Sequence, residues 1–371
     1  MPRADLRDRR TRAVAIALGA TLASGLALAP HPAQAHDRAA SHDLSGSALL
    51  SHCEGDSPIV CTFPGLDVGD YDVTVVLGDG DEATDTEVFA ESRRLMLESV
   101  VADAGEFERR SFTVNVRDPE GQQNQPVGTG DPGLTLTFSG TTPGIERITI
   151  TPASRRTQLI ALVGDSTVTD QETWPYTGWG QRLPAYFDRG VSVVNHSGSG
   201  ESTVSQLEKP EMFDALETRL RRGDVVLIQL AHNDKTTTAE QYRANLGEMI
   251  DRVRARGATP VLVTPIVRHR FENGQLTPTG LIVTDLADLP AEMRRVADEK
   301  EVPLIDLTAR SEELVESLGP VDSEPIYLVR INGDRTHTSE YGASVYAGVV
   351  AEELRGLGLV DERGWRGVQR P

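Results

Sequence analysis

Residues 159 to 167 read Leu159-Ile-Ala-Leu-Val-Gly-Asp-Ser-Thr167, five apolar residues followed by a small turn that carries hydroxyl groups. An apolar run without polar alternation is typical of a strand covered on both faces, as in a parallel sheet. Gly164 permits a sharp turn at the strand end. Because open α/β sheets bind ligands outside the carboxyl ends of their strands, Ser166 is a candidate nucleophile. The competing interpretation is a serine that caps a helix after a core strand.

The chain beyond this stretch alternates between strand and helix patterns. Amphipathic periodicity predicts helices at 239–256 and 285–300, and a last helix at 340–357 that Thr338 or Ser339 caps. This alternation predicts an α/β fold in which helices cover a parallel sheet. Further strands are predicted at 191–195, 225–230, 260–264 and 303–307.

The preceding region, residues 57–153, has the texture of an all-β domain. Its short runs are separated by Gly, Asp and Pro turns, which predicts a β-sandwich. The Gln-, Gly- and Pro-rich segment 121–133 is predicted to be a long surface loop. All three tryptophans lie outside this region, so a structural role is favoured over sugar binding. The predicted strands are 71–77, 84–91, 94–101, 111–117, 134–139 and 145–151.

The first 35 residues have the composition of a secretory leader. Five arginines precede an apolar run at 13–29, and Ala33-Gln-Ala35 supplies small residues for cleavage. We therefore expect a signal peptide at 1–35, a secreted, extracellular protein and an N-terminal tail at 36–56. The apolar run has only 17 residues, so no membrane anchor is expected after cleavage. Cys53 and Cys61 are expected to close a small disulfide loop.

The charge balance excludes several classes of function. The formal net charge is −19, and removing the leader's five Arg and two Asp makes it −22. Such a surface repels nucleic acid and anionic lipid. Lysine occurs only at 209, 235 and 300, and the arginines are scattered along the sequence, so no basic block compensates. The histidines and cysteines lack metal-ligand spacing, so neither a metal nor another cofactor is expected.

Three more polar stretches follow or precede elements of the predicted sheet. They are residues 195–202 after the second strand, 231–234 after the third, and 333–339 before the last helix. Each is expected at the carboxyl edge, which is the edge that Ser166 occupies. A serine nucleophile needs a base, a carboxylate that orients the base, and donors for the oxyanion. The four stretches together contain all of these groups.

These stretches resemble the sequence blocks of the SGNH (GDSL) hydrolase superfamily and, within it, the rhamnogalacturonan acetylesterase family. The likeness extends from Leu159 to about Leu357. Gly164-Asp-Ser-Thr167 resembles the nucleophile block, and Trp179-Gly, Thr264-Pro and Gly342-Ala also resemble the acetylesterase branch. The resemblance implies a flavodoxin-like parallel sheet with helices on both faces, in a catalytic domain at 154–360 that is followed by a tail at 361–371.

The resemblance also assigns roles to individual residues. It implies that Ser166 is the nucleophile, His337 the base and Asp334 the residue that orients the base. The oxyanion hole would consist of the backbone N–H groups of Ser166 and Gly200 and the side-chain amide of Asn233. Local hydrogen bonding, and not catalysis, is expected of Asp165, Asp234, His196 and His232.

Two positions depart from the family pattern. The acetylesterases often have Arg and Gly where this chain has Glu201 and Ala231, and a negative charge at 201 disfavours a strongly anionic substrate. Trp179, Arg268 and Arg270 are candidate substrate-binding residues.

The resulting functional hypothesis is a secreted, monomeric carbohydrate esterase. It would remove O-acetyl groups from an acetylated polysaccharide or oligosaccharide such as rhamnogalacturonan, without a metal. The alternatives are a lipase- or thioesterase-like SGNH hydrolase with another acyl preference, and a non-catalytic glycan-binding protein. The β-sandwich is expected to be dispensable for hydrolysis of a small ester.

Overall fold

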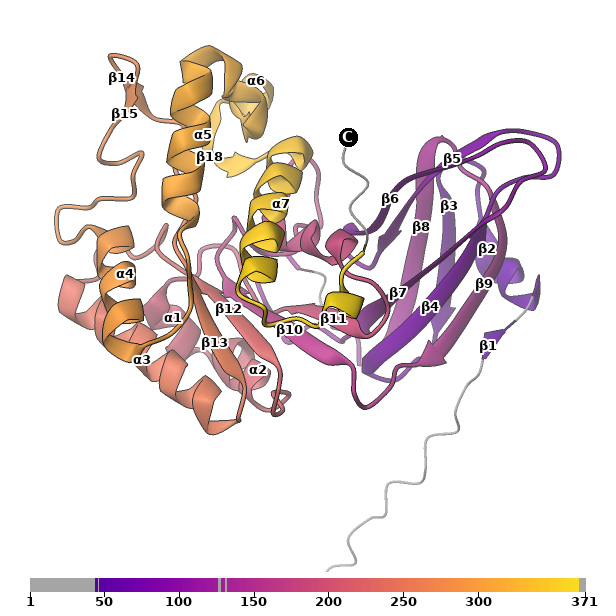
Figure 1. Ribbon diagram of the computed structural model, residues 1–371, viewed down its shortest axis with the longest axis horizontal. Helices are drawn as coiled ribbons and strands as arrows, with labels where there is room; N and C mark the ends of the chain where they lie inside the picture. The colour runs from indigo at the N-terminus through magenta and orange to yellow at the C-terminus, as the bar shows by residue number, and fades with distance from the viewer. Residues whose placement is uncertain (1–43, 46, 126–127, 131, 367–371) are drawn as a thin grey trace, which may run out of the picture. The chain divides into compact units, whose positions relative to one another are not determined.

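The computed structural model describes residues 44–366 except for positions 46, 126, 127 and 131 (Figure 1). The expected leader lies outside the described residues, as do parts of the two expected tails. Among the described residues, no helix has the length and apolar character that crossing a membrane requires.

A five-stranded parallel sheet forms the centre of the C-terminal half. Its strand order is β11-β10-β12-β13-β16, and every neighbouring pair is parallel. This order, with the first strand between the second and third, is the flavodoxin-like arrangement. The predicted α/β fold is therefore confirmed. The strands are β10 Gln158–Gly164, β11 Val191–Asn195, β12 Val225–Gln229, β13 Thr259–Val263 and β16 Leu304–Ile305.

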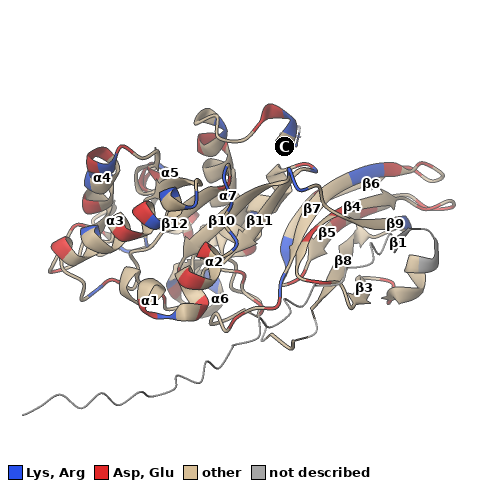
Figure 2. Cartoon of the chain, turned by 90° about the horizontal axis from the view of Figure 1, so that it is seen from below, with Lys and Arg blue, Asp and Glu red and all other residues tan. Residues whose placement is uncertain are grey.

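Both faces of this sheet are buried because its strands are apolar throughout. In β10, Ile160 and Leu162 belong to one apolar cluster, whereas Ala161 and Val163 belong to a second cluster on the opposite face. The first cluster includes residues of helices α5 (Leu307–Asp322) and α7 (Glu340–Gly356), and the second includes residues of α3 (Ala239–Ala255) and α4 (Leu289–Lys300). Figure 2 shows that β10, β11 and β12 carry no charged residue, whereas the helices carry both signs.

The predicted long helices are present with small changes at their ends. Helix α3 spans Ala239–Ala255, α4 starts late, at Leu289, because Asp288 caps it, and Ser339 caps α7 by accepting a hydrogen bond from the Gly342 N–H. The remaining bounds are α1 Thr203–Glu208, α2 Ala215–Glu217, α4 Leu289–Lys300, α5 Leu307–Asp322, α6 Val329–Asn332 and α7 Glu340–Gly356, with short strands β14 Phe271–Glu272, β15 Gln275–Leu276, β17 Tyr327–Leu328 and β18 Asp334–Thr338.

Two antiparallel sheets precede the parallel one. Their orders are β1-β9-β4-β7 and β2-β3-β8-β5-β6. One apolar cluster contains residues of both sheets, including Val73 and Phe112 of the first and Phe63 and Phe138 of the second. The bounds are β1 Leu44–Ser45, β2 Cys53–Glu54, β3 Ile59–Pro64, β4 Gly69–Leu77, β5 Thr84–Ala90, β6 Arg94–Ala102, β7 Glu108–Val116, β8 Gly133–Thr142 and β9 Ile145–Pro152.

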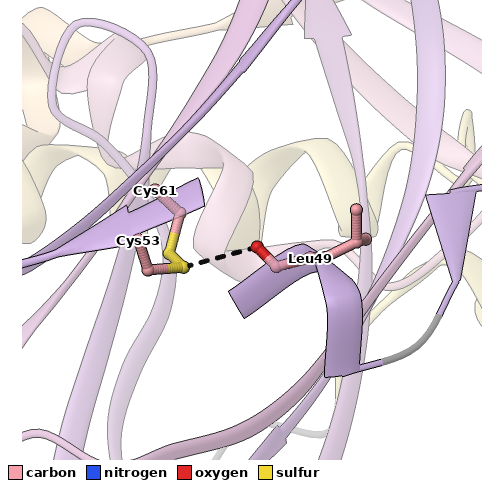
Figure 3. The surroundings of a disulfide bond; sticks show 3 residues. All are labelled: Leu49, Cys53 and Cys61. Carbon is pink, nitrogen blue, oxygen red and sulfur yellow. Dashed lines mark hydrogen bonds between the residues drawn. A yellow bond between two sulfur atoms is a disulfide. The ribbon is translucent and has the colours of Figure 1, made fainter. Parts of the chain in front are cut away.

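The expected disulfide is present. It joins Cys53 of β2 to Cys61 of β3, which face each other in the antiparallel pair, beside the backbone of Leu49 (Figure 3).

Candidate active site

Ser166, His337 and Asp334 form one hydrogen-bonded chain. Ser166 lies in the turn after β10, and its Oγ is 2.8 Å from His337 Nε2. His337 Nδ1 is 2.7 Å from Asp334 Oδ2. Since the carboxylate accepts the Nδ1 proton, Nε2 is left as the acceptor for the serine hydroxyl proton. The structure thus brings together the three residues that the sequence singled out for nucleophilic chemistry.

The Asp334 carboxylate is held ionised by its surroundings. Partial burial raises the pKa of this carboxyl group, but hydrogen bonds from the His337 side chain and from the backbone N–H groups of His337 and Thr336 lower it to about 2. Asp334 can therefore stabilise a protonated His337 throughout the neutral range.

The Asp165 carboxylate stabilises the turn that carries Ser166. It accepts hydrogen bonds from the Thr167 N–H and hydroxyl, and lies 3.1 Å from His232 Nδ1. The other ring nitrogen of His232 is 3.0 Å from the Ile266 carbonyl oxygen. Burial raises the pKa of Asp165, but His232 and the Thr167 donors outweigh burial and lower it. Asp165 and His232 thus hydrogen-bond locally, as expected from the sequence.

Asp234 and His196 form no hydrogen bond with Ser166, His337 or Asp334. Asp234 accepts hydrogen bonds from the Thr203 N–H and hydroxyl at the start of α1. His196 is fully buried, and burial together with the positive charge of Arg117 lowers its pKa well below the ordinary value. Its two ring nitrogens have no hydrogen-bond partner among the described residues, so the predicted local hydrogen bonding is wrong for His196.

The three groups expected to bind an oxyanion have N–H bonds that are free to donate. Neither the Ser166 nor the Gly200 backbone N–H donates a hydrogen bond to any described residue. Gly200 has φ +80°, which orients its N–H in a way that other residues rarely allow. One N–H of the Asn233 amide is used, because Nδ2 donates to the Glu201 carbonyl at 2.9 Å. The second N–H of that amide remains available, and the first holds the oxyanion loop, residues 197–201, in place.

Part of the site comes from a segment that the sequence did not indicate. The loop predicted at the surface, 121–133, in fact buries Gln122 and Gln125 against the C-terminal half, so the prediction is wrong there. The Gln125 amide donates to the carbonyl oxygens of Ser197 and Asn195 at 2.9 and 3.0 Å. The Gln123 carbonyl accepts from the Ser199 N–H at 3.1 Å. This segment fixes the backbone of the oxyanion loop.

A second contact from the N-terminal region holds the loop after the nucleophile. Arg93, in the turn between β5 and β6, donates to the carbonyl oxygens of Gln171 and Tyr176. Gln171 in turn donates to the Ser166 carbonyl at 2.7 Å, and the Tyr176 ring lies edge-on to the His337 ring at 5.3 Å. Arg93 lies about 80 residues before the loop that it contacts, and neither segment carries a motif, so no sequence signal could have identified this contact.

The three candidate substrate-binding residues differ in their burial and hydrogen bonds. Trp179 is only 1% exposed, and its Nε1 donates to Gln229, so the prediction is wrong and its ring is part of the core. Arg268 is partly buried and donates to the His232 carbonyl at 2.9 Å, which identifies a supporting role. Arg270 is exposed, and its guanidinium has no hydrogen-bond or ion-pair partner among the described residues.

The negative charge of Glu201 is compensated. Its side chain is buried, and one carboxylate oxygen lies 2.6 Å from Lys209 Nζ. The charge of Glu201 is therefore no longer a reason to exclude an anionic substrate. Within the described part of the chain, no three His, Cys, Asp or Glu side chains gather into a metal-binding group. The site as a whole has the groups that acyl transfer through a serine requires.

Comparison with known proteins agrees with this geometry. The model of the GDSL-like lipase/acylhydrolase family matches residues 162–344. The rhamnogalacturonan acetylesterase of Bacillus subtilis is 38% identical over 218 residues, which are 54% of this chain and 90% of that protein. A probable rhamnogalacturonan acetylesterase of the same organism is 30% identical over 211 residues, or 54% of this chain and 94% of the relative.

A solved structure shares the fold. The crystal structure of protein YxiM from Bacillus subtilis matches with a TM-score of 0.50 and 24% identity over 81% of this chain and 80% of that one. The chain belongs to the GDSL-like lipase/acylhydrolase family, the SGNH hydrolases. It is a carboxylic ester hydrolase of this type.

Proposed function

We propose that this protein is a secreted, monomeric esterase that removes O-acetyl groups from a plant-type polysaccharide such as rhamnogalacturonan. The observation that carries the proposal is the hydrogen-bonded chain from Ser166 Oγ through His337 to Asp334. The backbone N–H groups of Ser166 and Gly200, which have no partner among the described residues, support it. The substrate class follows from the likeness to the Bacillus acetylesterase.

Acyl transfer proceeds in two steps in this mechanism. Ser166 Oγ attacks the acetyl carbonyl carbon while His337 Nε2 takes the hydroxyl proton. The N–H groups of Ser166 and Gly200 and the free amide N–H of Asn233 stabilise the resulting oxyanion. Collapse of the tetrahedral intermediate breaks the ester bond, and His337 gives its proton to the departing sugar oxygen. Water then attacks the acetyl-enzyme by the same route, which releases acetate and restores the serine.

The rim of the site suits a glycan. Trp174, on the loop that also carries Tyr176, is 62% exposed and offers an aromatic face on which a sugar ring can stack. Arg270 offers a free guanidinium to a uronate carboxylate, and the Glu201–Lys209 pair removes the opposing charge.

In this proposal, the two antiparallel sheets form a β-sandwich domain, residues 57–153, that supports the site. Arg93 and Gln125 come from this domain and its loop, and both contact the loops that carry the reacting groups. The domain is therefore needed for full activity, which replaces the expectation that it is dispensable.

The test is acetate release from a panel of acetylated rhamnogalacturonan, acetylated xylan and longer-chain aryl esters. We expect release from rhamnogalacturonan and from aryl acetate, and loss of about 10⁴-fold or more with Ser166→Ala. The thermal transition should barely change. Preference for long acyl chains would favour a lipase-like enzyme, and a pure Ser166→Ala protein with full activity would refute the assigned nucleophile.

A further inference from the structure

An arginine-rich depression lies at the amino edge of the parallel sheet. It has a volume of about 720 Å³, which is in the range of ligand sites. Its walls are the segments that precede three adjacent strands: 155–158 before β10, 189–191 before β11 and 221–224 before β12. Residues 361–364 close it from the C-terminal turn. Six arginines line it, Arg155, Arg156, Arg189, Arg221, Arg222 and Arg363, against two acidic residues, Asp224 and Asp361.

Most of these guanidinium groups lack a close partner. The side chains of Arg155, Arg156 and Arg222 are exposed and form no ion pair or hydrogen bond with any described residue. Arg189 and Arg221 reach carboxylate oxygens only at 3.9 and 4.0 Å. This contrasts with a chain whose net charge is −19.

Two acidic residues against six arginines leave the depression with a net positive charge. Asp224 is buried, and its two oxygens accept hydrogen bonds from the backbone N–H groups of Leu159 and Arg221. The Asp361 carboxylate accepts two hydrogen bonds from the Arg363 guanidinium, at 2.9 and 3.1 Å. Since the other five like charges repel one another, an anion that enters the depression relieves that repulsion.

The depression is separate from the catalytic centre. Strand β10 runs between them, from Gln158 at the depression to Gly164 just before Ser166. A strand rises about 3.3 Å per residue, which puts the two sites about 20 Å apart. This exceeds the Debye length of about 8 Å at physiological salt, so the arginines do not act on the reaction electrostatically.

We propose that the depression is a second substrate site, which binds the carboxylates of a uronate-bearing polysaccharide. The choice of ligand rests on the proposed function, because the backbone of rhamnogalacturonan contains uronate. Planar guanidinium groups pair with planar carboxylates through two parallel hydrogen bonds. Several arginines in one depression can engage successive carboxylates of one chain, which raises the effective concentration of polymer at the active site.

The test measures binding without turnover. The full chain with Ser166→Ala is titrated with unacetylated polygalacturonate fragments, and Kd is measured by calorimetry. Adding Arg156→Gln and Arg222→Gln should weaken binding about four- to 25-fold, at two- to fivefold per exposed ion pair. The matched control is Arg109→Gln with Arg147→Gln, two exposed arginines on β7 and β9 that have no ion-pair partner among the described residues. This control pair removes the same charge and should change Kd by less than twofold relative to Ser166→Ala alone.

The outcomes separate this proposal from the proposed function. Equal weakening by both pairs of variants would mean that only the net charge matters, and an unchanged Kd would show that the depression does not bind the polymer. Binding of inorganic polyphosphate with the same dependence on Arg156 and Arg222, but no binding of polygalacturonate, would overturn the uronate assignment. Arginine-dependent polygalacturonate binding supports the site even if rhamnogalacturonan releases no acetate.

Discussion

The carboxyl and amino edges of the parallel sheet present polar groups in opposite ways. At the carboxyl edge, His337 is hydrogen-bonded both to the Ser166 hydroxyl and to Asp334, so the three side chains hold one another in place. At the amino edge, Arg156 and Arg222 have no close partner within the described structure. Bond making requires groups held to fractions of an ångström, whereas attraction of a charged polymer requires only that charges lie near one another. One sheet thus supports both kinds of surface.

The largest effect is expected from a substitution of Asp334, which is hydrogen-bonded to His337 at the carboxyl edge. Asp334→Asn should lower kcat for aryl acetate by about 10³- to 10⁴-fold, because an amide does not stabilise the protonated, correctly oriented His337. Initial rates from pH 5 to 9 measure this. A variant that keeps more than a tenth of the wild-type kcat would falsify the role of Asp334.

Asp334 should also affect the stability of the fold at acid pH. The pKa of Asp334 is lowered from 3.8 to about 2 in the folded protein. A lowered carboxyl pKa stabilises the fold above the unfolded value, and this contribution is lost as the pH falls through the folded value. The Tm advantage of the wild type over Asp334→Asn should therefore shrink between pH 5 and pH 2, and an advantage that grows in acid would contradict the assignment.

An intermediate effect is expected from the segment that braces the oxyanion loop. Gln125→Leu keeps the size of the side chain but removes its hydrogen bonds to Ser197 and Asn195, so the Gly200 N–H loses its fixed direction. We expect kcat to fall about 10- to 100-fold with little change in KM. Steady-state kinetics on an aryl acetate checks this.

The control for Gln125 lies at the other edge. Gln158 also donates to two carbonyl oxygens, those of Gly223 and Leu359, but at the amino end of β10. Gln158→Leu should lower Tm and leave kcat unchanged. If both substitutions reduce kcat in proportion to the loss of Tm, Gln125 contributes only stability.

The smallest effect is expected for a free charge on the rim of the active site. Arg270→Gln should lower kcat/KM on acetylated rhamnogalacturonan about two- to fivefold and leave aryl acetate hydrolysis unchanged, since an exposed ion pair contributes little. Arg268→Gln should instead affect both substrates, because Arg268 holds the His232 carbonyl beside the nucleophile turn. Equal effects of the two substitutions on both substrates would show that Arg270 and Arg268 do not have different roles.

Ser166 and Asn233 could be placed at the carboxyl edge because they follow strands whose type is evident from the sequence, whereas the roles of Asp334 and His337 were implied by the resemblance to the SGNH hydrolases. The apolar run before Ser166 and the strand before Asn233 specify a parallel sheet, and parallel strands end at one edge. The role of Trp179 was predicted wrongly, because a tryptophan near a nucleophile can be directed to the core or to the pocket, and the sequence carries no signal for that choice.

The sequence by itself thus determined the class of fold, the candidate catalytic residues and the sheet edge at which they are expected, since these depend on local hydrophobic patterns and short motifs. Only the tertiary structure decided that Gln125 braces the oxyanion loop and that arginines between positions 155 and 363 share one depression. Their proximity arises because the amino ends of β10, β11 and β12 are neighbours in the sheet, although about 30 residues separate each from the next in the sequence. Whether a charge is paired depends on such neighbours in space, which a net charge of −19 conceals.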